Sequence, residues 1–338
     1  MRASVVVPVY NAARSVAPTV EALLALEGPD GPPELVLVDD GSTDDTAAVL
    51  SAYPVRVIGR PNGGPAAARN TGWRSSHGDV VLFTDSDCVP PPGWVNGMLA
   101  AFADPAVGAA GGSYDIANPG NRLSRLIHAE ILRRHAGMPA RVKALGSYNL
   151  AVRREVLERV GGFDESFATS SGEDNDLSYR VRGAGFQLAF NPACTVAHRH
   201  PERVRPYLRT QFVHGYWRSH LYRRHAAYMK GDDYSGFGDF LDAFLAALTL
   251  AGAGAAPALA ALAPRLAPPA AVAAAASLAA LLGVSGVTAG RLARRAGDGS
   301  LLPFGTLVLA ARAFARITGW FLGALRVPLP GKAFRRQR

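Results

Sequence analysis

Cysteine is almost absent from this sequence of 338 residues, which contains only Cys88 and Cys194. The two follow no metal-binding spacing and predict no disulfide framework, which fits a reducing compartment. Charged side chains are also scarce, at 19% of the residues against 49% hydrophobic ones. This balance excludes a globally disordered chain, and the length allows one large domain or two ordinary ones.

Net charge is missing from most of the chain as well. The formal charge of +9 lies entirely in residues 291–338, where ten Lys and Arg side chains accompany one acid, Asp298. Residues 1–290 are balanced and lack the basic face that nucleic-acid binding requires, so we expect no nucleic-acid partner. A basic tail next to apolar segments instead predicts contact with an anionic membrane surface.

The first 90 residues alternate short apolar runs with amphipathic stretches. Strands are predicted at 4–9, 34–38, 55–58 and 79–84, and helices at 15–26, 45–52 and 64–76. This rhythm is typical of an α/β fold with a mostly parallel sheet covered on both faces. Beyond the proline cluster at 90–92, segments 145–152, 154–160 and 186–190 predict a second, mixed half. Residues 1–5 lead directly into the first strand, so no signal peptide is expected.

Two long uncharged stretches follow the predicted domain, which we place at 1–230. Residues 243–264 and 266–290 are each long enough to cross about 30 Å of hydrocarbon as a helix. Only Arg265 separates them, so we predict a transmembrane hairpin at 240–290; two buried helices of a soluble domain are the alternative. Three arginines at 291–295 follow the second span, and the positive-inside rule then places the domain and the tail in the cytoplasm.

Two further helices are predicted beside this hairpin. Residues 204–225, within the segment 203–230, are rich in Arg and aromatic side chains and read as either a surface helix or a membrane-interface helix. The basic tail 291–338 contains an apolar stretch at 301–325 with Arg312 and Arg316 four residues apart. That spacing puts both on one face and favours an amphipathic helix in the membrane plane over a third span.

The polar residues that follow the predicted strands share one chemical theme. Asp85-Ser86-Asp87 ends the fourth strand, and its carboxylates lie on one side of an extended backbone. Tyr10-Asn11 and Asp39-Asp40 end two others, and Arg69 lies in a helix after a Gly-rich turn. These ends converge on one edge of a parallel sheet, where open α/β folds bind ligands. Oxygen ligands there suit Mg²⁺ or Mn²⁺, so the sequence predicts a nucleotide-diphosphate pocket with a divalent ion.

Five motifs in a fixed order resemble those of family 2 glycosyltransferases with the GT-A fold, of the membrane-anchored bacterial type. The resemblance covers roughly residues 3–200 and rests on V-V-V-P-V-Y-N, V-D-D-G-S-T-D, N-G-G-P-A-A-A-R-N-T-G, D-S-D and G-E-D-N-D-L. It implies a doubly wound mixed sheet and inverting transfer from a UDP- or GDP-sugar with Mg²⁺ or Mn²⁺. The implied acceptor is lipid-linked or a cell-envelope glycan, at the cytoplasmic face of the inner membrane.

The resemblance also implies donor and metal roles. Donor binding falls to Pro8, Tyr10, Asn11, Asp39, Asp40, Arg69, Asp85 and Ser86. For Arg69 an ion pair with Asp39 or Asp40 is the alternative. Asp87 matches the main metal ligand, and Asp85 would contact ribose, or the metal through water. His198 is expected as a further metal ligand, with His200 as the alternative.

Glu173-Asp174 resembles the acceptor-activating acids of the family. An inverting enzyme needs one carboxylate to take the proton of the acceptor hydroxyl as its oxygen attacks the anomeric carbon. We expect Asp174 in this role, with Glu173 as the alternative, and ordinary carboxylate pKa values maintained by the charges of metal and donor. Tyr148 and Asn149 are expected at the acceptor site, and a loop at 111–115 in the sugar pocket.

One departure separates the chain from the processive synthases of the family. Those carry Q-x-x-R-W, whereas residues 211–217 read Q-F-V-H-G-Y-W and lack the Arg-Trp pair. Together with only two predicted spans, this favours the addition of a single sugar. A polyprenyl-phosphate monosaccharide transferase, a non-catalytic nucleotide-sugar-binding membrane protein and a nucleotidyltransferase are the alternatives.

Overall fold

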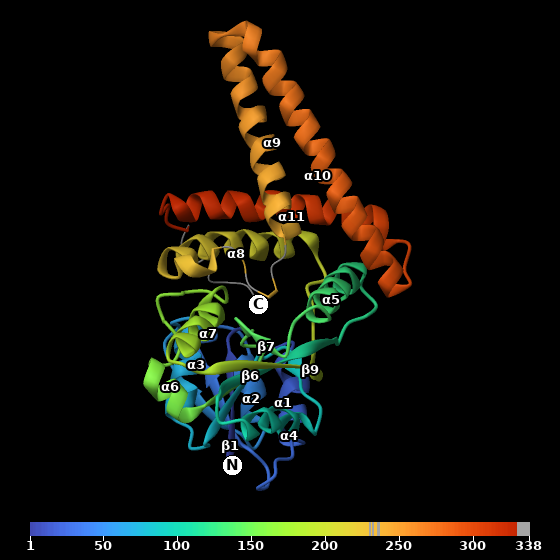
Figure 1. The fold of residues 1–338 in the computed structure, drawn as a ribbon. Helices are drawn as coiled ribbons and strands as arrows, with labels where there is room; N and C mark the ends of the chain where they lie inside the picture. Colours follow the sequence, from blue (N-terminus) through green and yellow to red (C-terminus); the bar gives the residue numbers. More distant parts are fainter. Residues whose placement is uncertain (230, 232, 235–236, 330–338) are drawn as a thin grey trace.

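The computed structural model describes residues 1–329 apart from 230, 232, 235 and 236, so the end of the predicted basic tail lies outside the described residues (Figure 1). A nine-stranded sheet forms the centre of the N-terminal domain, in the order β3-β2-β1-β4-β8-β6-β9-β5, with β7 paired to β9. The strands are β1 (Ala3–Val9), β2 (Glu34–Asp39), β3 (Arg56–Gly59), β4 (Val80–Thr84), β5 (Cys88–Val89), β6 (Val107–Ile116), β7 (Arg141–Val142), β8 (Asn149–Arg153) and β9 (Gln187–His198).

The first half of the sheet is parallel, as the sequence predicts. β1 pairs in parallel with β2 and β4, and β2 pairs in parallel with β3. Val5, Val6 and Val7 are completely buried. Helices cover both faces of such a sheet, so successive side chains of the strand point into an apolar layer on either side. The helices of the domain are α1 (Val16–Leu24), α2 (Thr46–Ser51), α3 (Pro65–Arg74), α4 (Trp94–Leu99), α5 (Arg122–His135), α6 (Arg154–Val160) and α7 (Glu173–Gly183), with the 3-10 turn η1 (Ala100–Ala103).

Strand direction reverses in the second half, and this reversal places the polar strand ends. β8 runs antiparallel to β4 and pairs Thr84 with Asn149, so the residues after β4 lie beside those before β8. The short β5 runs antiparallel to β9 and pairs Cys88 with His198, which brings the neighbouring Asp87 close to that histidine. Residues 111–115 belong to β6, so the prediction of a loop there was wrong. The neighbouring strands explain the glycine at 112, because a Cβ there would lie 1.9 Å from the backbone oxygen of Cys194 in β9.

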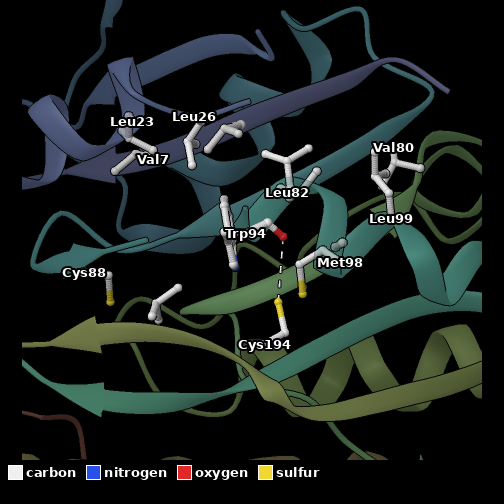
Figure 2. Close-up of a cluster of buried hydrophobic side chains, with 14 of the residues drawn as sticks. Val7, Leu23, Leu26, Val80, Leu82, Cys88, Trp94, Met98, Leu99 and Cys194 are labelled. Atoms are coloured by element: carbon white, nitrogen blue, oxygen red, sulfur yellow. Dashed lines mark hydrogen bonds between the residues drawn. The ribbon is translucent and has the colours of Figure 1, made fainter. Parts of the chain in front are cut away.

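The core on the α1 and α4 side of the sheet contains the two cysteines (Figure 2). Trp94 and Met98 pack there with Leu82, and the thiol of Cys194 lies 3.8 Å from the backbone oxygen of Trp94. Cys88 and Cys194 are both buried and form no disulfide with each other, and their side chains pack in the apolar core.

The C-terminal region consists of long helices outside this sheet. They are α8 (Val204–Arg224), α9 (Phe237–Leu262), α10 (Ala267–Ala296) and α11 (Leu301–Ala324), with short 3-10 turns η2 (Ala226–Tyr228) and η3 (Pro264–Leu266). The segments Gly238–Leu262, Pro264–Ala296 and Leu301–Ala324 are long and apolar enough to cross a membrane. In Figure 1, α9 and α10 project away from the domain as a hairpin, whereas α11 lies across its base, alongside α8. That the hairpin spans a membrane stays a prediction.

α11 packs unusually close to α8 because glycines line the contact. A Cβ added to Gly319 would lie 2.0 Å from the backbone oxygen of Phe212, and one on Gly215 would lie 2.0 Å from that of Arg316. Arg312 and Arg316 do share a face, but both ion-pair with acids of neighbouring helices. Several exposed side chains of α11, among them Leu307 and Phe321, are apolar. That α11 lies in the membrane plane rather than spanning the membrane stays a prediction.

Candidate active site

A small cavity of about 100 Å³ lies where the carboxyl ends of β1 and β4 meet the start of α3. Pro65 suits the first turn of α3, because its φ is fixed and its missing N–H is not needed there. Gly64 precedes it at φ +91°, and a Cβ there would lie 2.9 Å from the backbone oxygen of Ala168. The lining includes six of the predicted donor residues, namely Pro8, Tyr10, Asp40, Arg69, Asp85 and Ser86. The sequence motifs did indicate these residues, but not the loop 168–170 that closes the cavity.

Asp40 organises the glycine-rich turn beside this cavity. Its carboxylate, 2% exposed, accepts hydrogen bonds from the backbone N–H groups of Gly63 and Gly64, at 3.0 and 2.7 Å. It also pairs with Arg60 Nη1 at 2.7 Å, a partner that the sequence motifs did not reveal. Burial raises the pKa of Asp40, although these donors oppose the shift. Its oxygens are therefore already engaged in holding the turn.

Asp39 and Asn11 connect neighbouring loops without lining the cavity. Asp39 Oδ1 accepts from the N–H of Ser42 at 2.9 Å, and Asn11 Oδ1 accepts from the N–H of Thr43 at 2.7 Å. Asn11 adopts a left-handed φ of 50°, which asparagine tolerates better than most residues. Their donor contacts stay predictions, but their hydrogen bonds show how the loop after β2 is held against Tyr10.

Arg69 is completely enclosed and joins two parts of the site. It pairs with Asp85 at 2.8 Å and with Glu173 at 2.9 Å. The alternative of an ion pair with Asp39 or Asp40 was therefore wrong: Arg60, not Arg69, is the partner of Asp40. Arg69 is buried on α3 and reaches the start of α7 through its pair with Glu173. The positive charge of Arg69 therefore neutralises Asp85, in the small cavity, and also Glu173, at the start of α7.

Asp87 and His198 approach each other where β5 pairs with β9. Asp87, Cys88 and His198 form a group whose potential ligand atoms lie within 4.8 Å of one another. His198 Nε2 is buried and lies 3.5 Å from Asp87 Oδ2, and it has no hydrogen-bond partner among the residues that the structure describes. A buried nitrogen lone pair beside a carboxylate fits a divalent cation. Asp85 lies outside this group and pairs with Arg69, so its contact with metal stays a prediction.

Glu173 and Asp174 begin α7, after Gly172 at φ +90°. Glu173 is 2% exposed. Asp174 Oδ1 accepts from the N–H of Asn175 at 2.8 Å. Burial raises the pKa of both carboxyls, and the negative charge of Asp174 raises that of Glu173 further. The expected ordinary pKa values therefore do not describe the bare protein, because desolvation outweighs the attraction of Arg69. Asp176, in the same turn, is occupied by Arg180 and His225.

A second, larger cavity of about 650 Å³ continues from the first. Arg69, Asp85 and Ser170 line both, so the two spaces meet at this point. Asp174 and Tyr148 line the larger one, which extends to residues of α5, α8, α9 and α11. Tyr148 stacks on Tyr114 with ring centroids 3.5 Å apart. The Asp174 carboxylate thus faces a space large enough for a second substrate.

Asn149, the other predicted acceptor residue, does not line the larger cavity. Its side-chain oxygen accepts from Trp94 Nε1 at 2.8 Å, and its amide nitrogen donates to the backbone oxygens of Ser113 and Cys194 at 2.9 Å. These bonds satisfy the buried side chain from three elements. The structure therefore gives Asn149 a role in fixing β8 against β6 and β9, and an acceptor contact for it is not supported.

Known proteins resemble this chain in both sequence and fold. Residues 4–161 match the model of a family described as "Glycosyl transferase family 2". A "Pre-mycofactocin glycosyltransferase" of Mycobacterium tuberculosis is 32% identical over 223 residues, which cover 63% of this chain and 46% of that protein. "Glycosyltransferase AglE" of Haloferax volcanii is 30% identical over 208 residues, which cover 59% of this chain and 67% of that protein.

Among solved structures, that of the mannosyltransferase PcManGT from Pyrobaculum calidifontis, in complex with GDP-Man and Mn²⁺, aligns with a TM-score of 0.54. The alignment covers 94% of this chain and 87% of that one at 21% identity, a likeness that shows the fold alone. The fold is therefore of the GT-A class. The chain belongs to glycosyl transferase family 2. It spans about half the length of curated relatives such as the mycobacterial protein.

Proposed function

We propose that this protein is a metal-dependent inverting glycosyltransferase. It would move one sugar from a UDP- or GDP-sugar to a lipid-linked or cell-envelope glycan acceptor, at the cytoplasmic face of the inner membrane. The observation that carries this proposal is the junction of the two cavities at Arg69 and Asp85, with Asp174 in the lining of the larger one and Asp87 two positions after Asp85 in the chain. A donor in the small cavity would present its sugar at this junction, to an acceptor that enters from the larger one.

Donor binding would use the strand ends. Tyr10 and Pro8 offer flat surfaces for the base, and the turn held by Asp40 leaves backbone groups beside the ribose and phosphates. A divalent cation held by Asp87 and His198 would neutralise charge on the departing diphosphate. The solved neighbour's complex with GDP-Man and Mn²⁺ supports a nucleotide sugar and a divalent ion in general.

Asp174 is the proposed base. The acceptor hydroxyl oxygen forms a bond to the anomeric carbon while the bond from that carbon to the diphosphate breaks, and the hydroxyl proton moves to Asp174. Attack from the side opposite the leaving group inverts the anomeric centre. Glu173 is the weaker candidate because Arg69 already holds one of its oxygens. Burial raises the pKa of Asp174 and thereby makes it a better proton acceptor once it is ionised.

A panel of UDP- and GDP-sugars tests the proposal, with nucleoside diphosphate release followed in the presence and absence of Mg²⁺ or Mn²⁺ and with membrane lipid extract as the acceptor. Asp87→Ala and Asp174→Asn should both abolish transfer. Asp79→Asn is the matched control, because Asp79 is exposed at the opposite end of β4. Full activity of both site variants would refute the assignment.

The same assay separates the alternatives. Transfer to purified polyprenyl phosphate alone would make the protein a monosaccharide-carrier synthase. Pyrophosphate release from a nucleoside triphosphate would indicate a nucleotidyltransferase, and donor binding without turnover on any acceptor a non-catalytic protein.

A further inference from the structure

The larger cavity has two chemically different ends. At the sheet it is lined by Ser147, Tyr148 and Asp174, where the proposed chemistry takes place. At the helices its lining includes the apolar side chains of Phe240 and Ala243 on α9 and of Ile317 and Trp320 on α11. A water-soluble sugar acceptor has no use for the apolar end, whereas an amphiphile can occupy both.

Arginines lie between these two ends. Arg134, Arg218, Arg312 and Arg316 line the helical part of the cavity, against the acids Glu130 and Asp239. Glu130 engages Arg134 and Arg312, and Asp239 engages Arg134 and Arg316. Arg316 is bound more loosely: it lies 3.4 Å from Asp239, and its side chain is 35% exposed. Its guanidinium donates from Nε to Gln211 at 2.8 Å, and no bond from its Nη2 is found in the described part of the chain.

The apolar end opens at the root of the hairpin. α9 leaves the domain at this point (Figure 1), and Phe240 and Phe244, one turn apart, are 41% and 59% exposed. We propose that the larger cavity binds a lipid that carries a phosphate group, with its hydrocarbon chain against α9 and α11 and its phosphate at Arg316. This rests on the proposed function, since it assigns that lipid as the acceptor whose reacting hydroxyl faces Asp174.

Direct binding tests the lipid site without any turnover. Full-length protein in detergent is equilibrated with radiolabelled farnesyl phosphate, and farnesol and inorganic phosphate are added as competitors. Farnesyl phosphate should bind, farnesol should compete at least about tenfold more weakly, and inorganic phosphate should not compete at equal concentration. Ile317→Trp should reduce binding about tenfold by filling the apolar end, and Arg316→Gln by a similar factor. Leu307→Trp, on an exposed face of the same helix, is the control and should bind normally.

Equal binding by Ile317→Trp, or equal competition by farnesol, would overturn the proposal. Displacement by inorganic phosphate alone would show a plain anion site and would also overturn it. Failure of the proposed function is a separate result: the lipid would still bind, but no nucleoside diphosphate would be released from any nucleotide sugar.

A different observation carries a second inference, about His200. Its Nδ1 lies 3.0 Å from Nδ1 of His198, so the two rings share one proton across this contact. A neutral histidine that offers Nε2 to a metal must carry its proton on Nδ1. His198 would then donate from Nδ1 to Nδ1 of His200, and His200 would carry its own proton on Nε2. We infer that His200 is a positioning residue that fixes the tautomer and the ring orientation of the proposed metal ligand, rather than a ligand itself.

Manganese binding tests this role apart from activity. The electron paramagnetic resonance signal of free Mn²⁺ reports binding to the full-length protein with no donor present. His200→Phe removes the acceptor and should weaken Mn²⁺ binding about tenfold. His200→Asn supplies an oxygen in its place and should recover most of the affinity, whereas His198→Ala should not bind better than His200→Phe. Wild-type affinity in His200→Phe, or no recovery in His200→Asn, would overturn the inference.

Discussion

Glu173 and Glu130 are both buried and both face arginines, yet their environments have opposite effects. Burial by itself raises the pKa of each carboxyl. At Glu173 the nearby Asp174 raises the pKa further, and Arg69 is shared with Asp85, so the net shift is upward. At Glu130 the attraction of Arg312 and Arg134 outweighs burial, and the pKa lies well below its usual range.

The difference separates two charged clusters. The strained centre is Arg69 with Asp85, Glu173 and Asp174, where the acids outnumber the cation; the compensated centre is Glu130 and Asp239 with their arginines, where each acid is neutralised. Around Arg69, three acids compete for one cation, which is costly for folding but suits a site that binds a cation and accepts a proton. Around Glu130, each acid has two arginine partners, and the pairs join α5 to α9 and α11. The first centre has the composition that the proposed chemistry requires, and the second attaches the long helices to the domain.

The largest expected effect distinguishes the two centres by activity. Asp174→Asn keeps the shape of the side chain but removes the proton acceptor, so transfer should fall about 10³-fold. Binding of the nucleotide sugar, measured by calorimetry, should be nearly unchanged. Glu130→Gln, at the other centre, should lower the rate per folded molecule far less, because Glu130 lines the proposed lipid cavity but takes up no proton in the proposed reaction. A large loss of rate in Glu130→Gln and none in Asp174→Asn would reverse the assignment of the two centres.

Stability should show the opposite ranking. Glu130→Ala leaves Arg134 and Arg312 buried without their carboxylate, and breaking a buried pair in this way costs about 3–5 kcal/mol. Thermal unfolding in detergent measures the loss. Glu158→Ala, on the exposed side of α6, is the control and should change the unfolding free energy by less than about 0.5 kcal/mol. An equal effect of the two variants would mean that the Glu130 cluster does not hold the helices.

The sequence could predict the strained centre but not the compensated one. Asp85, Asp87, Glu173 and Asp174 lie in short local motifs at strand ends or a helix start, where the backbone alone fixes their direction. Their partners were predicted less well, because the pairing of Arg69 with Glu173 spans 104 positions and depends on how α3 packs on α7.

Glu130 carries no local signal at all. It lies in the middle of a helix, and its partner Arg312 is 182 positions away on α11. The helix periodicity did place Arg312 and Arg316 on one face of α11, but it could not tell whether that face meets water or a buried acid. For Asn149, too, the motif position does not show that neighbouring strands already use the hydrogen-bonding groups of its side chain.

Two arginines of α3 provide a smaller and more local contrast. Arg69→Met leaves Glu173 and Asp85 without their cation and should destabilise the protein by about 3 kcal/mol at neutral pH. The loss should shrink at lower pH, because the acids can then take up protons. Arg74→Met removes an exposed pair with Glu165 at 3.5 Å and should cost under about 1 kcal/mol. Thermal midpoints at two pH values measure both, and similar losses would contradict the central position of Arg69.

The smallest effect is the pH dependence of stability, which should have opposite signs at the two centres. A lowered pKa at Glu130 means that its contribution is present above the ordinary glutamate pKa and is lost as the pH falls below that range. A raised pKa at Glu173 means that the folded protein holds the proton more tightly than the unfolded chain. Stability should then fall as the pH rises from the ordinary pKa to the raised one.

Each slope is limited to about 1.4 kcal/mol per pH unit for one proton. Unfolding of wild type, Glu130→Gln and Glu173→Gln between about pH 3.5 and 8 isolates the two contributions as differences from wild type. The loss of unfolding free energy in Glu130→Gln, relative to wild type, should vanish toward acid pH. Glu173→Gln should instead gain unfolding free energy relative to wild type as the pH rises toward neutral. Slopes of the same sign would show that Arg69 compensates its acids as fully as Arg134 and Arg312 compensate Glu130, and the distinction between the two centres would fail.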